Sequence, residues 1–226
     1  MTAPPTRSRI KVCGLTREAD LDAAAAAGVD AVGFVLYAPS PRAVTPVRAA
    51  ELARRLPPWV TPVLLFVDED PAAARAALEA IPGSMAQFHG DETPRQCADS
   101  TDGGRIPFLK VARIPLAGPA FDLVKFAGDY PMARAILLDA HVEGYGGSGK
   151  TFDWSRLPPS VAAHLVLSGG LTPANVGDGI RALRPRCLSL AVDVSSGVES
   201  AKGIKDPGKI HRFIAAVQAA DGLQRA

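Results

Sequence analysis

The 226-residue sequence predicts an α/β protein whose parallel strands close into a single (β/α)8 TIM barrel. Three observations support this fold class. Short apolar runs rich in β-branched residues recur along the chain, each is followed by a segment suited to a helix, and there are eight such units. An open doubly wound sheet is the competing architecture. It is disfavoured because no Gly-rich dinucleotide fingerprint follows the first apolar run.

The expected strands share short apolar composition and a following turn or loop. They are Ile10–Leu15, Ala31–Leu36, Pro62–Val67, Met85–His89, Phe108–Ala112, Ala135–Asp139, His164–Leu167 and Leu188–Val194. Several intervening helices begin with a Thr-Pro or Asp-Pro pair, which suits a helix N-terminus. The expected helices are Glu18–Ala27, Pro46–Leu56, Pro71–Ala80, Pro94–Ser100, Pro119–Phe126, Pro173–Leu183 and Pro207–Val217. The sequence patterns that predict the fourth, fifth and sixth helices are short or weak.

No linker divides the chain, so residues 1–226 are expected to form one domain with residues 1–8 as a flexible N-terminus.

Composition and charge exclude several classes of protein. The 25 basic and 23 acidic side chains give a net charge of +2, which does not favour a nucleic-acid partner. The apolar stretches are shorter than the ~20 residues that span a membrane, and no secretory signal is readable. Cys13, Cys97 and Cys187 lack the spacing of disulfide or zinc frameworks, so a cytoplasmic protein without a metal is expected. The sequence identifies no protein partner.

Polar residues and loop glycines gather where the expected strands end. They are Cys13, Arg42, Gln87, His89, Lys110, Asp139, Ser168, Gly169, Gly170, Asp193, Ser195, Ser196 and Gly197. In a (β/α)8 barrel these strand ends form the catalytic mouth. Burying such groups without partners would cost several kcal/mol. A polar mouth that holds a ligand is therefore expected there.

Two glycine-containing loops predict a phosphate site. Ser168-Gly169-Gly170 follows the seventh strand and Ser195-Ser196-Gly197 follows the eighth. Glycine lets backbone N–H groups approach an anion closely, and barrel enzymes often bind a substrate phosphate at these two loops with a short extra helix. Residues Val198–Ile204 provide enough chain for that helix. A phosphorylated small molecule is the expected ligand.

Cys13 and Asp139 are the candidates for acid–base chemistry. Lys11 shares a strand face with Cys13, so its cation is expected to bring the pKa of the thiol towards neutrality and make it a base. A small buried residue is the alternative interpretation of this cysteine. Asp139 ends the sixth strand, either as a carboxylate that caps its loop or as an acid whose pKa is raised by partial burial.

Three further residues of the mouth suit ligand contacts. Gln87 and His89 share a strand face, and both are expected to hydrogen-bond the ligand. Arg42 follows the stiff turn Pro39-Ser40-Pro41, which can aim a guanidinium at a carboxylate. A solvated surface position is the alternative for this arginine.

The segment Gly144–Thr151 reads GYGGSGKT and matches the phosphate loop of nucleoside triphosphatases. That motif needs a strand running into its first glycine and a substantial helix beginning at its lysine. Here Gly144 comes five positions after Asp139, and Pro158-Pro159 stops a helix after about two turns. We interpret the segment as a mobile loop able to close over a substrate.

Eight segments share their pattern with one known family. They are KVCGLT at Lys11–Thr16, GFV at Gly33–Val35, SPRAV at Ser40–Val44, QFHG at Gln87–Gly90, LLD at Leu137–Asp139, GYGGSGKTFDW at Gly144–Trp154, LSGGLTPANV at Leu167–Val176 and VDVSSGVE at Val192–Glu199. In this order they resemble the phosphoribosylanthranilate isomerases of tryptophan biosynthesis over almost the whole chain. Ala43 and Phe88 depart from the aromatic residue and the leucine of many members.

The resemblance implies a barrel without cofactor or metal and an Amadori rearrangement of N-(5-phosphoribosyl)anthranilate. It implies that Asp139 is the general acid and Cys13 the general base. Arg42 matches the position that meets the anthranilate carboxylate, and Asp193 resembles a residue near the sugar hydroxyls. The phosphate cradle corresponds to Gly169, Gly170, Ser196 and Gly197, with Ser168 beside it.

Two other functions compete with this one. A related aminoaldose isomerase of the histidine pathway resembles this chemistry but uses two aspartates, whereas the first strand here ends in Cys13. A barrel that only binds a phosphorylated ligand would leave an acid and a base at different strand ends unexplained. A turnover assay separates an enzyme from a binding protein.

Overall fold

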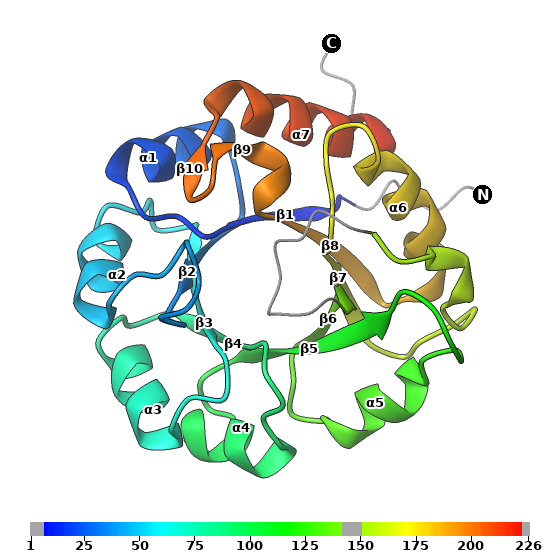
Figure 1. The fold of residues 1–226 in the computed structure, drawn as a ribbon, viewed down its shortest axis with the longest axis horizontal. Helices are drawn as coiled ribbons and strands as arrows, with labels where there is room; N and C mark the ends of the chain where they lie inside the picture. Colours follow the sequence, from blue (N-terminus) through cyan, green and yellow to red (C-terminus); the bar gives the residue numbers. More distant parts are fainter. Residues whose placement is uncertain (1–6, 142–150, 223–226) are drawn as a thin grey trace.

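The computed structural model describes residues 7–141 and 151–222. Eight parallel strands form a closed barrel in sequence order, and helices surround it (Figure 1). The predicted (β/α)8 fold is confirmed. Of the expected flexible N-terminus, residues 1–6 lie outside the described residues. Ser8 is buried and donates from its backbone N and its hydroxyl to Asp221, at 2.6 and 2.9 Å.

The barrel strands agree with the predicted ones to within a few residues. They are β1 Arg9–Cys13, β2 Ala31–Val35, β3 Thr61–Phe66, β4 Met85–Phe88, β5 Phe108–Pro115, β6 Ala135–His141, β7 His164–Leu167 and β8 Ser189–Val194. The helices are α1 Glu18–Ala27, α2 Pro46–Ala53, α3 Pro71–Glu79, α4 Pro94–Ser100, α5 Leu123–Asp129, α6 Val176–Leu183 and α7 Pro207–Ala220, with 3-10 turns η1 Trp154–Arg156 and η2 Arg184–Arg186. In the described part of the chain between β6 and β7, η1 is the only helical element.

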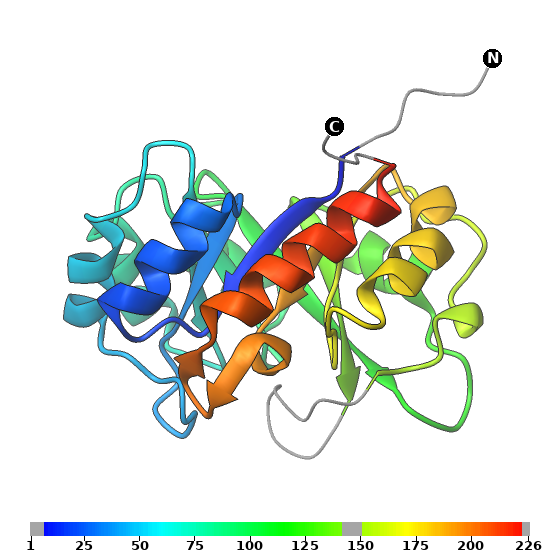
Figure 2. The ribbon, with the colours of Figure 1, turned by 90° about the horizontal axis from the view of Figure 1, so that it is seen from above.

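The segment after β8 differs from the prediction. The helix expected over Val198–Ile204 is replaced by a 3-10 turn, η3 Ser196–Val198, and a small antiparallel pair, β9 Glu199–Ala201 and β10 Ile204–Lys205. Figure 2 shows this pair (orange) at the end of the barrel where β1 (blue) also ends. The segment thus covers one side of the barrel mouth.

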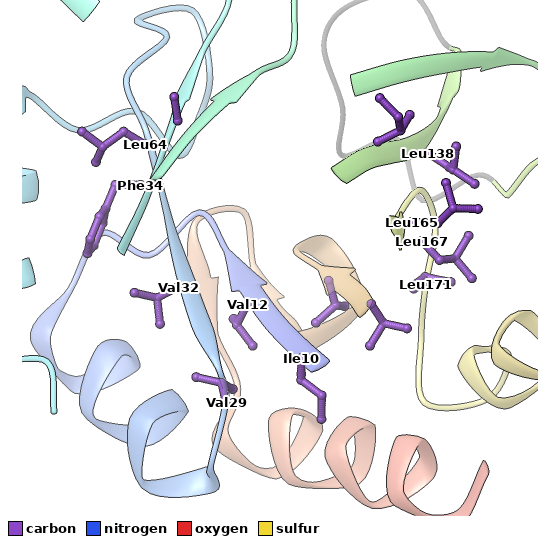
Figure 3. Packing of buried hydrophobic residues seen from close by; sticks show 14 of the residues in the cluster. Ile10, Val12, Val29, Val32, Phe34, Leu64, Leu138, Leu165, Leu167 and Leu171 are labelled. Atoms are coloured by element: carbon purple, nitrogen blue, oxygen red, sulfur yellow. The ribbon is translucent and has the colours of Figure 1, made fainter. Parts of the chain in front are cut away.

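Alternating side chains build two apolar layers. The outer layer fills the space between strands and helices, and Figure 3 shows Ile10 and Val12 of β1 in it beside Val32 of β2. The inner layer consists of Leu109, Val111, Leu137 and Val166, with Met85, Ala135 and Ala191 packed against them. Since the period of a strand is two residues, the neighbours of outward apolar residues point into the barrel. Polar side chains at the strand ends therefore meet inside the mouth.

Helix α7 illustrates how the sequence specifies the outer layer. The Asp206 side chain accepts a hydrogen bond from the backbone N of Lys209, and Pro207 occupies the first turn. Ile210, Phe213, Ile214 and Val217 form an apolar stripe at helical spacing, and all four are buried. This helix lies between α1 and α6 in the ring (Figure 1). None of the helices in the described ranges has the length and apolar composition needed to span a bilayer.

Lys110 does not lie in the mouth, so that part of the prediction was wrong. Its neighbours Leu109 and Val111 face the barrel interior, which turns Lys110 outward. Its ammonium donates to Glu92 Oε2 at 2.7 Å and to the Gly90 carbonyl at 2.9 Å, and both charged side chains are 2% exposed. This buried ion pair anchors the loop after β4 to β5.

We expect Lys110→Met to lower the free energy of unfolding by about 3–5 kcal/mol, because it leaves a buried Glu92 without its cation. Urea unfolding measures the loss. The double variant Lys110→Met/Glu92→Gln is the control and should recover most of the stability. A Lys110→Met protein of normal stability that fails to bind sugar phosphates would place the lysine in the mouth after all.

Candidate active site

One pocket opens at the carboxyl ends of the barrel strands. It is lined by Cys13, Val35, Tyr37, Ser40, Arg42, Leu65, Val67, Gln87, His89, Asp139, Ser168, Gly169, Gly170, Leu171, Asp193, Ser195 and Ser196. The structure thus brings together the predicted site residues except Lys110, which faces outward, and Gly197, which follows Ser196 in the adjacent turn. Barrel closure explains this convergence, since β1, which ends at Cys13, and β8, which ends at Val194, are neighbouring strands.

The pocket has an apolar side and a polar side. Cys13, Val35, Leu65 and Val67 form one buried cluster, with Tyr37 packed against it. His89, Asp139 and the loop after β7 supply polar groups to the same pocket. An apolar surface beside polar groups suits a ligand with a flat apolar part and a polar part. Sequence patterns alone did not identify Tyr37 or Val67 as lining residues.

A buried ion pair lies at the floor of the pocket. Lys11 Nζ and Asp193 Oδ1 are 2.9 Å apart, and the two residues are 4% and 5% exposed. Ser168 also donates to Asp193, at 3.4 Å. Gly33 makes room for these groups, because a Cβ there would lie 2.5 Å from the Cys13 Sγ and 3.1 Å from the Lys11 Nζ. The glycine of β2 therefore allows a lysine and a thiol to share the barrel interior.

The environment of Cys13 differs from the predicted one. Burial raises the pKa of the Cys13 thiol, and the nearby Lys11 only partly opposes this effect. Asp193 adds to the increase because its negative charge disfavours a thiolate. The expectation of a pKa lowered towards neutrality was therefore wrong for the ligand-free pocket. The prediction considered Lys11 but not the carboxylate that neutralises it, which comes from the far end of the chain.

Asp139 belongs to a chain of hydrogen bonds across the mouth. Its Oδ2 lies 3.0 Å from His89 Nε2, and His89 Nδ1 lies 3.2 Å from Gln87 Nε2. The Ala140 backbone N donates to Asp139 Oδ1 at 2.9 Å. Both ring nitrogens of His89 are thus engaged by protein. All three side chains are buried.

Gly169 allows the loop after β7 to reach this carboxylate. Its φ of +79° lies in the left-handed region that favours glycine. A Cβ at this position would also lie 2.7 Å from Asp139 Oδ1 and from the Ala140 backbone N. The residue is therefore required both by backbone conformation and by space.

Arg42 is not free in the mouth. Its Nε and Nη2 donate to Glu199 Oε1 and Oε2, both at 2.7 Å, and Lys205 donates to the same carboxylate at 2.8 Å. Burial would raise the pKa of Glu199, but the two cations hold it below its ordinary value. Burial lowers the pKa of Lys205, although Glu199 partly opposes this change. The sequence prediction missed Glu199 and Lys205; only the presence of Glu199 in the VDVSSGVE segment could have drawn attention to it.

The two predicted phosphate loops lie side by side. A Cβ at Gly197 would collide with the backbone of Leu171, so the turn after β8 packs directly on the loop after β7. Within the described residues, the backbone N–H groups of Gly170, Ser196 and Gly197 have no protein acceptor. Asn175 donates to the Gly170 carbonyl at 3.0 Å and braces the loop. Such a group of free N–H donors can bind an anion.

The described residues contain no cluster of three or more His, Cys, Asp or Glu side chains that could hold a metal ion. Of the predicted mobile loop, residues 144–150 lie outside the described residues. The described chain that follows forms only the η1 turn and not the long helix of a nucleotide-binding phosphate loop.

The sequence and the fold match one family consistently. The model of N-(5'phosphoribosyl)anthranilate (PRA) isomerase matches residues 10–216. An N-(5'-phosphoribosyl)anthranilate isomerase of Methylibium petroleiphilum is 61% identical, with 95% of this chain and 96% of the relative covered. One from Dechloromonas aromatica is 56% identical, with 95% and 98% covered.

Solved structures match the same family. The phosphoribosyl anthranilate isomerase from Thermotoga maritima superimposes with a TM-score of 0.77 at 36% identity, covering 94% of this chain and 99% of that one. A phosphoribosyl anthranilate isomerase in complex with reduced 1-(o-carboxyphenylamino)-1-deoxyribulose 5-phosphate has a TM-score of 0.74 at 34% identity, with 96% and 100% covered.

The closed barrel with its polar mouth places this protein among the TIM-barrel enzymes. More specifically, the chain belongs to the N-(5'-phosphoribosyl)anthranilate isomerase family, whose members are isomerases of tryptophan biosynthesis.

The pKa of Cys13 provides a test of the pocket's electrostatics. We expect Asp193→Asn to lower the pKa of the thiol, because it removes a negative charge and leaves Lys11 to favour the thiolate. Alkylation of each cysteine, followed by mass spectrometry as a function of pH, measures this. Cys97 is an internal control, since burial outside the site raises its pKa to about 12. An unchanged or higher pKa of Cys13 in Asp193→Asn would contradict the assigned electrostatics.

Proposed function

We propose that this chain catalyses the Amadori rearrangement of N-(5-phosphoribosyl)anthranilate, an aminoaldose, to the aminoketose 1-(2-carboxyphenylamino)-1-deoxyribulose 5-phosphate. The observation that carries this proposal is one pocket in which Cys13 of β1 and Asp139 of β6 face the same space. That pocket lies between an apolar cluster and two loops with free backbone N–H groups. The family relation supports the same chemistry.

Asp139 is the proposed general acid. Its proton goes to the furanose ring oxygen, the bond between C1 and that oxygen breaks, and the nitrogen lone pair forms a C1=N Schiff base. Asp139 is left as a carboxylate, which the Ala140 backbone N and His89 stabilise by hydrogen bonds. A carboxyl group with donors already in place needs little rearrangement when it loses its proton.

Cys13 is the proposed general base. Its thiolate removes the proton from C2, and the electron pair of the C–H bond forms a C1=C2 double bond while the Schiff-base nitrogen is neutralised. The resulting enolamine tautomerises to the ketone. Lys11 is the cation that favours the thiolate, whereas burial raises the pKa of the thiol in the ligand-free pocket. The rate should therefore rise with pH as the thiolate forms.

The remaining residues hold the two ends of the substrate. The N–H groups of Gly169, Gly170, Ser196 and Gly197 are proposed to bind the phosphate, with Ser168 and Asp193 near the sugar hydroxyls. Since Glu199 occupies Nε and one edge of Nη2 of Arg42, the anthranilate carboxylate is proposed to meet the outer N–H groups of Nη1 and Nη2. The aromatic ring would then lie against the apolar cluster around Val35 and Leu65.

We also propose a cytoplasmic location and one domain over residues 1–226, with no cofactor and no nucleic-acid partner. The three free cysteines suit a reducing compartment. An isomerase that uses two aspartates is disfavoured because β1 ends in Cys13.

A fluorescence assay that follows loss of phosphoribosylanthranilate tests the function. We expect turnover by the unaltered protein, and at least ~10²-fold slower turnover in Cys13→Ser and in Asp139→Asn, the usual size of a lost acid or base. Both variants should keep the circular-dichroism spectrum and substrate binding. Turnover like that of the unaltered protein in either variant would remove that residue from the mechanism, and no turnover by the unaltered chain would refute the function.

Arg42→Met should weaken binding of the product analogue by about 1.5–3 kcal/mol, the worth of a charge-assisted hydrogen bond. Ribose 5-phosphate binding should barely change, because the phosphate loops lie elsewhere in the mouth. Arg42→Lys should recover only part of the loss, since a point charge cannot replace a planar fork.

Because Arg42 also neutralises Glu199, the control is Arg42→Met/Glu199→Gln, which leaves no unpaired carboxylate. Calorimetric titration of both ligands gives the affinities. Equal weakening of the two ligands in the double variant would mean that Arg42 shapes its loop and does not bind the carboxylate.

A further inference from the structure

Gln87 lies at the end of the hydrogen-bonded chain that reaches Asp139. Gln87 is 0% exposed, and its Nε2 is 3.2 Å from His89 Nδ1. His89 Nε2 in turn lies 3.0 Å from Asp139 Oδ2. Gln87 itself has no contact with the acid, so its influence on Asp139 passes through the imidazole ring.

The amide nitrogen of Gln87 decides where the proton of His89 sits. An amide NH2 group can only donate, so Nδ1 must accept with its lone pair. In this arrangement a ring with its proton on Nε2 would donate to Asp139 Oδ2. A second proton on Nδ1 would face the amide hydrogens and is disfavoured.

The other half of the amide supports a functional role. Gln87 Oε1 is buried and has no hydrogen-bond partner among the described residues. An unpaired buried acceptor costs about 1–3 kcal/mol, so its presence in a native structure requires an explanation. The opposite amide orientation would bring Oε1 to Nδ1–H, but His89 would then lose its neutral Nε2–H donor to the carboxylate. The observed orientation keeps that donor.

In the described part of the chain, the other charged groups near Gln87 are directed to partners of their own. The strands beside β4 place Leu65 and Leu109 opposite Gln87 in the sheet register. Besides His89 and Asp139, the charged or titratable groups that face the same pocket are Cys13, Tyr37, Arg42 and Asp193. Arg42 and Asp193 are held in ion pairs with Glu199 and Lys11. Glu92, beyond the end of β4, is paired with Lys110 on the outer side of the barrel.

We propose that Gln87 is a positioning residue that keeps His89 neutral with its proton on Nε2. This inference rests on the proposed function, in which Asp139 must carry a proton before it can give one away. A charged imidazolium would hold Asp139 as a permanent carboxylate by ion pairing and remove the acid. A neutral Nε2–H donor instead allows Asp139 to be protonated and then stabilises the carboxylate that remains after the proton has moved to the substrate.

Gln87→Glu is the decisive variant, because a carboxylate accepts a hydrogen bond from Nδ1–H, whereas the amide NH2 group donates one to Nδ1. The pKa of His89 should rise and its ring should be doubly protonated at neutral pH. We expect kcat to fall at least ~10-fold at pH 7 while KM changes less than ~3-fold, since a general-acid contribution is lost and not a binding contact. Gln87→Met is the control of similar size, because methionine neither donates a hydrogen bond to His89 Nδ1 nor accepts one from it. The kcat of this variant should rise towards that of the unaltered protein as the pH rises above the ordinary His pKa of about 6.5.

Nitrogen-15 spectra of the histidine rings in ligand-free protein report the tautomer directly, with His89 assigned by the loss of its signals in His89→Asn. We expect the neutral Nε2–H form in the unaltered protein and imidazolium in Gln87→Glu at the same pH. An Nδ1–H ring in the unaltered protein would overturn the inference, as would an unchanged ring and pH profile in Gln87→Glu. These spectra can be recorded without turnover. If the inference about Gln87 is wrong, the spectra differ from those expected. If the proposed function is wrong, the unaltered protein is inactive although its spectra are as expected. Thermal unfolding confirms that each variant is folded.

Discussion

The ion pair between Lys11 and Asp193 is the interaction on which the site depends. It joins β1 to β8, the two strands that meet only when the barrel closes, and both residues face the interior at the level of the pocket floor. Neither charge could be buried there without the other, because an uncompensated charge in the interior costs several kcal/mol. Closure of the barrel and assembly of the polar floor are thus one event. The Cys13 thiol lies beside this pair, and its protonation responds to both charges.

The need to give each buried charge a partner also applies around the mouth. Three charged groups that face the pocket already have a protein partner: Arg42 has Glu199, Asp139 has His89, and Asp193 has Lys11. These contacts fix the orientation of the side chains before a substrate arrives. Fixed dipoles and charges stabilise a reacting group without rearranging, which is the main way that enzymes lower barriers. Phe88 departs from the family pattern yet lies in the outer layer against Phe66 and Phe108, away from the chemistry.

Local patterns could predict most of the fold. The eight apolar runs, the Thr-Pro and Asp-Pro helix starts and the stripe of α7 depend only on neighbouring residues, and each appears in the structure near its predicted bounds. The segment after β8 could not be predicted in this way. Its Glu199 pairs with an arginine 157 residues earlier in the chain, and that long-range contact favours a short hairpin over the expected helix.

The sequence by itself predicted the barrel and most of the polar residues of its mouth, because these follow from spacing and residue type, and its motifs resemble those of the family to which the chain belongs. Only the tertiary structure decided which charges meet. Lys110 turned outward to Glu92, Cys13 acquired a raised pKa and His89 turned to Asp139, since each outcome depends on residues brought together by barrel closure. Electrostatic interactions depend on distance in space and on burial, and neither quantity can be derived from separation along the chain.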